Sequence, residues 1–104
     1  MFKDLLPIGS IVKIKNAERE FMICGRVVAK SGSKEVYDYL GCMYPEGIID
    51  PSELYFFNQI GIEECVYRGF EDDQELNFRK NVLETLNDVQ VVDGKIVPKS
   101  STPQ

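Results

Sequence analysis

Apolar and polar residues alternate along the first two thirds of the chain, and this period of two predicts short β-strands. In residues 8–15, for example, Val12 and Ile14 face one way and the intervening lysines face the other. Residues 21–29 are almost continuously apolar, which is typical of a buried central strand. The stretch 37–47 begins as a third strand, and two more strands are predicted over residues 54–57 and 62–68.

The pattern changes after Phe70 to one that predicts a helix. Asp72 followed by Glu75 forms a capping-box signature, and the acidic residues suit the positive end of the helix dipole. The predicted helix ends at residues 87–88. Its apolar stripe consists of Phe78, Val82, Leu83 and Leu86.

Residues 89–97 predict a terminal hairpin, with Asp93 and Gly94 in a type I′ turn. Strands followed by a segregated helix indicate the α+β class. We expect a small antiparallel sheet or partly closed barrel of about five strands, one C-terminal amphipathic helix and the hairpin. The 104 residues are predicted to form one globular domain, 1–97, with a flexible polar tail over 98–104.

Several residues with special backbone preferences mark expected turns. Gly25, inside the central strand, predicts a bulge or a close backbone approach. The residues expected to serve turn geometry are Gly9, Gly41, Gly47, Asp93 and Gly94.

The net charge of −5 argues against nucleic acid as a partner, because phosphates require a basic surface. No window is apolar enough to span a membrane and no signal peptide is visible, so a cytoplasmic location is the expectation. The three cysteines show no metal-site or redox spacing and are expected to be buried, reduced thiols.

The sequence offers little catalytic chemistry. It has no histidine, and we expect no cofactor and no metal ion. Cys42, beside a turn, is the best candidate nucleophile, although a small core residue is the favoured interpretation. The acidic run 71–75 lacks the spacing of a calcium loop and is interpreted as a solvated helix start.

Charge and aromatic residues point instead to protein binding. Residues 11–34 carry six bases and two acids, while the later segment is acidic, so docking of a partner and self-association both stay open. The aromatic residues exceed what a small core holds. The residues predicted to contact a protein partner are Tyr37, Tyr39, Tyr44, Pro45, Glu46, Tyr55 and Phe57.

The chain resembles the bacterial domain of unknown function numbered 4176 from about Leu5 to Leu83. The resemblance rests on LPIGSIV at 6–12, MICGR at 22–26, YDYLGCMYPEG at 37–47, FFN at 56–58 and VYRGFED at 66–72. It implies a setting in Gram-positive bacteria, in type VII secretion loci near toxins with an N-terminal LXG domain. It implies no catalytic residues.

These observations leave three functional hypotheses. The first is a non-enzymatic, chaperone-like accessory or targeting factor that binds an LXG toxin or its small helical partners. The second is an immunity protein that neutralises a toxin's effector domain, since an acidic protein suits a basic nuclease toxin. The third is an enzyme that uses Cys42.

Overall fold

The computed structural model describes residues 2, 4–86 and 89–98. Five antiparallel strands form one sheet, which confirms the predicted α+β class. The order across the sheet is β4-β3-β2-β1-β5, and no ladder joins the edge strands β4 and β5 within the described chain, so the sheet is open. The strands are β1 (Ile11–Ile14), β2 (Glu20–Ala29), β3 (Val36–Tyr44), β4 (Tyr55–Phe57) and β5 (Ile62–Tyr67).

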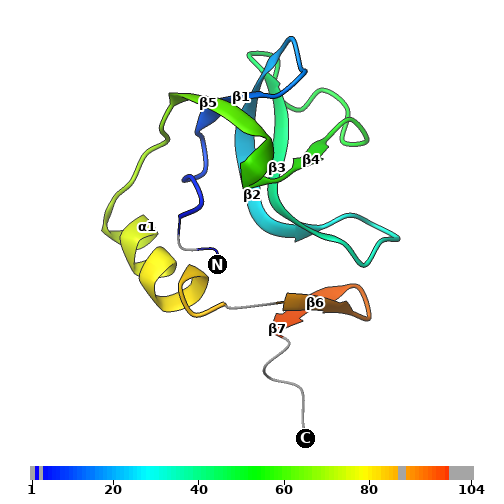
Figure 1. Cartoon of the computed structure of the whole chain (residues 1–104), viewed down its shortest axis with the longest axis vertical. Coiled ribbons are helices and arrows are strands. Elements are labelled where there is room, and N and C mark those ends of the chain that lie inside the picture. The colour runs from blue at the N-terminus through cyan, green and yellow to red at the C-terminus, as the bar shows by residue number, and fades with distance from the viewer. Residues whose placement is uncertain (1, 3, 87–88, 99–104) are drawn as a thin grey trace, which may run out of the picture.

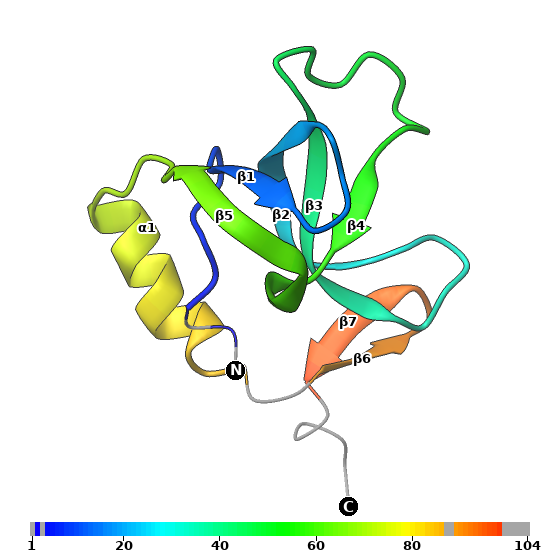
Figure 2. The same cartoon turned by 45° about the horizontal axis from the view of Figure 1, so that its top comes forward.

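A 3-10 turn, Gln59–Gly61, carries the chain from β4 at one edge to β5 at the other. The sheet is therefore strongly curled, as Figures 1 and 2 show. Its concave side holds the core, in which Val12, Ile23 and Tyr39 have no exposed surface. Strand residues that alternate in the sequence supply this core, as the period of two predicted.

Glycine sits where the sheet leaves no room for a side chain. Cys24 is an extra residue in β2, because Ile23 pairs with Gly41 and Gly25 pairs with Leu40; this confirms the predicted bulge. Gly41 was expected in a turn, and this prediction was wrong: the residue lies within β3. A Cβ on Gly41 would come 2.8 Å from the ring of Phe57, so the residue serves close packing.

The other predicted turn residues behave as expected. Gly9 and Gly47 have φ angles of 90° and 80°, in the left-handed region that favours glycine. Asp93 (φ 52°) and Gly94 (φ 76°) join β6 (Val89–Val92) to β7 (Lys95–Pro98) as a type I′ hairpin. β7 runs through Pro98, and the rest of the predicted tail lies outside the described residues.

The helical segment differs from its prediction. Helix α1 (Asp73–Phe78) passes directly into a π turn, Arg79–Leu83, in which the amide of Glu84 donates to the carbonyl of Arg79 at 2.8 Å. The π turn adds a residue per turn and rotates the apolar stripe out of register. Leu83 is buried and Leu86 packs against the core, but Phe78 and Val82 are 43% and 39% exposed, so only part of the predicted apolar stripe faces the core.

Asp72 caps α1 as predicted, and its carboxylate accepts from the Glu75 amide at 3.0 Å. The predicted end of the helix at 87–88 lies outside the described residues. Figure 1 shows α1 to one side of the sheet and the β6–β7 hairpin at its lower end. Val89 of that hairpin is 8% exposed and belongs to the core.

Candidate protein-docking surface

Two loops meet at one end of the sheet, the end opposite the β6–β7 hairpin in Figure 1. One is the β1–β2 loop and the other is the β3–β4 loop, residues 45–54. Arg19 of the first donates hydrogen bonds to both carboxylate oxygens of Glu46 and to the carbonyl of Tyr44 at 3.2 Å. These contacts hold the pKa of Glu46 below its ordinary value. The two loops are therefore tied together across the top of β2 and β3.

A hollow of about 510 Å³ opens between these loops and β5. Its charges are unbalanced. Arg19 is offset by Glu46, and Lys13 lies 4.0 Å from Glu64. Three further carboxylates line the hollow, those of Glu18, Glu20 and Glu63. Within the described chain no lysine or arginine forms an ion pair with them, so the hollow has an excess of negative charge. Its lining consists of Lys13, Ala17, Glu18, Arg19, Glu20, Tyr44, Pro45 and Glu63.

Glu63 reaches the hollow because β5 is irregular. Lys13 pairs with Glu64 and Ile14 pairs with Ile62, so Glu63 is an extra residue in the ladder. A second shift, between Ile11 and Val12, interrupts the same pairing. Such bulges bend an edge strand and re-aim its side chains.

Exposed apolar side chains lie on and beside the β3–β4 loop, whose first residue, Pro45, lines this hollow. Ile48 and Ile49 are 54% and 77% exposed, and Tyr44 and Tyr55, which flank the loop, are 41% and 38% exposed. One face of Tyr55 packs on Phe21 at a ring-centroid distance of 4.9 Å, so its ring is held in place. We call Tyr44, Ile48, Ile49 and Tyr55 the loop patch.

The structure divides the seven predicted partner-binding residues. Tyr44, Pro45, Glu46 and Tyr55 lie together at this end of the sheet. Tyr37 lies elsewhere, against Phe56 at 5.4 Å, and its hydroxyl donates to Glu35.

Tyr39 and Phe57 were wrongly predicted to face a partner. They are 0% and 7% exposed, because β4 adds to β3 at this point and the two rings pack at 5.4 Å inside the curl. The Tyr39 hydroxyl accepts from the Leu6 amide at 2.8 Å and donates to Gln59. Burial raises the pKa of Tyr39.

Sequence reasoning missed Ile48, Ile49 and Arg19. The two isoleucines were interpreted only as part of a connection. The available signal was an apolar pair between Gly47 and Pro51, in a segment that turn residues keep out of the sheet. Nothing local indicated that Arg19 would bind Glu46, 27 positions away.

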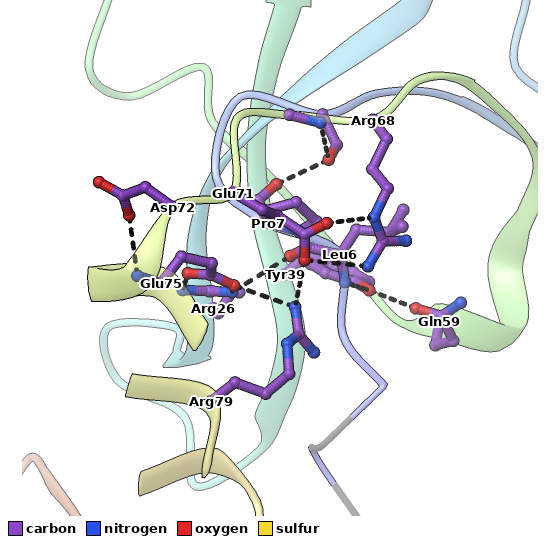
Figure 3. A network of polar contacts seen from close by, with 12 residues as sticks. Leu6, Pro7, Arg26, Tyr39, Gln59, Arg68, Glu71, Asp72, Glu75 and Arg79 are labelled. Atoms are coloured by element: carbon purple, nitrogen blue, oxygen red, sulfur yellow. Dashed lines mark hydrogen bonds and ion pairs between the residues drawn. The ribbon is translucent and has the colours of Figure 1, made fainter. Parts of the chain in front are cut away.

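A second cluster of charged residues lies under α1 (Figure 3). Arg26 of β2 donates to both carboxylate oxygens of Glu75 at 2.7 and 2.8 Å, and Arg79 donates to Glu75 at 3.0 Å. These hydrogen bonds, chiefly those from Arg26, lower the pKa of Glu75. Glu71 bridges Arg68 and Arg79 at 2.8 and 3.7 Å.

This cluster attaches helix α1 to the sheet. The side chains of Arg26 and Glu75 are only 7% and 12% exposed, and the guanidinium of Arg26 also lies over the ring of Phe78 at 5.4 Å. Every buried side-chain nitrogen or oxygen of the described residues has a hydrogen-bond partner.

The fold also explains the uneven charge along the sequence. Three bases of the segment 11–34 pair with acids from later elements: Lys13 with Glu64, Arg19 with Glu46 and Arg26 with Glu75. Three of the six basic residues in this segment are therefore neutralised by ion pairs within the molecule.

The three cysteines have different environments. Cys42 is 2% exposed and Cys24 is half-buried, and burial raises the pKa of Cys24. Cys65 is exposed on the edge strand β5, so the prediction that all three are buried was wrong. The burial of Cys42 favours its interpretation as a small core residue, since a nucleophile needs access to its substrate.

Two searches of the described part of the chain gave no site. No helix in it is both long and apolar enough to cross a membrane. In the same residues no three cysteine, aspartate or glutamate side chains are arranged to hold a metal ion.

Comparisons with known proteins place the chain in a family. Neither the curated proteins nor the solved structures gave a significant match. The comparison with protein families matched residues 5–78, which include β1 to β5, α1 and the whole YDYLGCMYPEG stretch, to the domain of unknown function DUF4176. The π turn and the β6–β7 hairpin lie beyond the match. Because the matched region covers more than half of the 104 residues, the chain belongs to the DUF4176 family.

Proposed function

We propose that this protein is a non-enzymatic binding module that acts as an accessory or targeting factor for a secreted toxin. The observation that carries the proposal is the loop patch, in which four large apolar side chains are exposed and one of them, Tyr44, lines a polar hollow. Ile49, at 77% exposure, is the most exposed of them. A rigid apolar surface rimmed by polar groups is typical of protein interfaces.

The surroundings of the patch support a docking role. Tyr44 and Tyr55 are anchored by strands β3 and β4, and the Arg19–Glu46 pair ties the loop to the neighbouring hairpin. Little conformational entropy is therefore lost when a partner binds. The described residues that line the hollow include no cysteine, serine or threonine, and their charged groups suit the recognition of a partner.

The resemblance noted above suggests the partner: an LXG toxin exported by a type VII secretion system, or one of its small helical partners. The cytoplasm, where such a cargo is held before export, is the proposed location. The central experiment is co-expression with the LXG protein encoded in the same locus, followed by affinity purification. A stable complex is expected, and failure to form one with any product of that locus contradicts the proposal.

An immunity protein is the second candidate, and the acidic hollow favours it because many nuclease toxins present basic surfaces. The region of toxin that binds distinguishes the two. Binding to the N-terminal LXG helices supports the accessory role, while binding to the C-terminal effector domain, with loss of its toxicity, supports immunity.

A further inference from the structure

We infer that the loop patch docks a basic amphipathic segment of its protein partner, in which lysine or arginine side chains lie next to apolar ones. This inference rests on the proposed function and specifies the chemistry of the partner. It is drawn from one juxtaposition: Tyr44 of the loop patch, together with Pro45, lines a hollow that has an excess of carboxylates.

Tyr44 joins the two parts of the surface. It lines the hollow and also belongs to the loop patch, and it pairs in register with Glu20 of β2. A segment that covers the patch therefore passes the mouth of the hollow. A volume of about 510 Å³ is large enough to admit a long side chain together with water.

The charges decide which side chain enters. The hollow and its two ion pairs bring together five carboxylates, those of Glu18, Glu20, Glu46, Glu63 and Glu64, against the two cations Lys13 and Arg19. The whole chain adds to this field with its net charge of −5. A concave surface with one sign of charge concentrates the opposite charge, so a lysine or arginine is attracted and an acidic segment is repelled.

The same charges argue against a second copy of this chain as the occupant. A second copy would bring another net charge of −5 to an already acidic surface. Its own hollow carries the same excess of carboxylates. Self-repulsion of this kind disfavours a symmetric contact.

Two labelled peptides test the inference. They share one set of apolar residues, and the remaining positions are lysine in one and glutamate in the other. Fluorescence anisotropy is expected to show that the lysine peptide binds at least about tenfold more tightly, and that added salt weakens its binding. Equal binding of the two peptides overturns the inference.

Variants locate the binding. The triple variant E18Q/E20Q/E63Q is expected to bind the lysine peptide at least about fivefold more weakly, with a flatter salt dependence. The matched control D4N/D73N/E84Q removes the same number of charges from exposed positions outside the hollow and is expected to change the affinity by no more than about twofold. An equal loss in both triple variants means that only net charge is being sensed, and it overturns the inference.

The complex with the LXG protein separates this inference from the proposed function. If the complex forms and E18Q/E20Q/E63Q binds as tightly as the unmodified chain, the inference is wrong and the proposed function stands. If no product of the locus binds, the proposed function is wrong. In that case the peptide measurements still test whether the surface prefers basic segments, independently of the toxin.

Discussion

Arg26 and Glu75 are 49 residues apart in the sequence and form a two-pronged ion pair at 2.7 and 2.8 Å. Each side chain is largely shielded from water, at 7% and 12% exposure. Helix α1 has no fully buried residue of its own, so this pair is its main attachment to the sheet. The helix turns Glu75 toward the sheet and leaves Leu76 and Phe78 exposed, the reverse of the usual arrangement.

We first predict that Glu75→Gln lowers the free energy of unfolding by about 3 kcal/mol, because Arg26 is left as a buried charge without its counter-ion. Urea denaturation gives the value. Asp73→Asn, on an exposed residue of the same helix, is expected to cost less than about 1 kcal/mol. The double variant R26M/E75L is expected to be more stable than the Glu75→Gln variant, since it removes both buried charges. Equal stability of the Glu75→Gln variant and the unmodified chain contradicts the role given to the pair.

The same pair predicts how stability depends on pH. The hydrogen bonds from Arg26 lower the pKa of Glu75 in the folded chain below its ordinary value of 4.5. The stabilisation is therefore complete above pH 4.5 and is lost as the pH falls through the folded-state pKa. The melting temperature, measured from neutral to acid pH, is expected to fall less for the Glu75→Gln variant than for the unmodified chain. If the melting temperatures of the two proteins fall by the same amount, Glu75 is not the source of the pH dependence.

Gly69 gives a third prediction, one about backbone packing. A Cβ there would meet the backbone of Ile8 and lie 2.9 Å from the amide nitrogen of Ser10, and backbone atoms cannot move aside as a side-chain end does. The Gly69 amide also donates to the buried Ser10 hydroxyl at 2.8 Å. Gly69→Ala is expected to cost about 2 kcal/mol. Gly61→Ala is the control, because its Cβ would meet only Ile14 at 4.0 Å, and it should change stability by less than about 1 kcal/mol.

Cys42 provides the fourth prediction, which separates binding from catalysis. The side chain is 2% exposed, so Cys42→Ala is expected to lower stability by about 1 kcal/mol and to leave partner binding and cellular function unchanged. Alanine is preferred to serine here because a buried hydroxyl without a partner would add its own cost. Loss of cellular function in a folded Cys42→Ala protein, with binding intact, would support the enzyme hypothesis.

The strands were predictable because the pattern of apolar and polar residues in each one reflects which of its faces are buried. β2 and β3 were expected close to their observed bounds, and the Asp93–Gly94 hairpin followed from its turn residues. The π turn at Arg79–Leu83 was not predictable, since the stripe of Phe78, Val82 and Leu86 fits an ordinary helix equally well. The contacts that position α1 depend on pairing between distant residues, which no local pattern encodes.

The candidate surface was predicted in part for the same reason. Tyr44 and Tyr55 flank a turn, and this local feature was visible in the sequence. Whether Tyr39 faces the core or a partner depends on β4 joining β3 at that point, which is a property of the whole sheet. The hollow arises from a bulge in β5 next to the β1–β2 loop, so it appears only once the strands are paired.

The central claim is that the loop patch binds a partner, and Ile49 tests it most directly. At 77% exposure, Ile49→Ser is expected to change stability by no more than about 0.5 kcal/mol. Ile60 is 83% exposed, and the turn that contains it, between β4 and β5, lies away from the β3–β4 loop in Figure 2, so Ile60→Ser is the matched control.

The deciding measurement is the dissociation constant of the complex with the LXG protein, determined by titration calorimetry for the unmodified chain and these two variants. The account predicts that Ile49→Ser weakens binding at least about tenfold, while Ile60→Ser leaves it within about twofold. Unchanged affinity in the Ile49→Ser variant, or an equal loss in both variants, would contradict the claim.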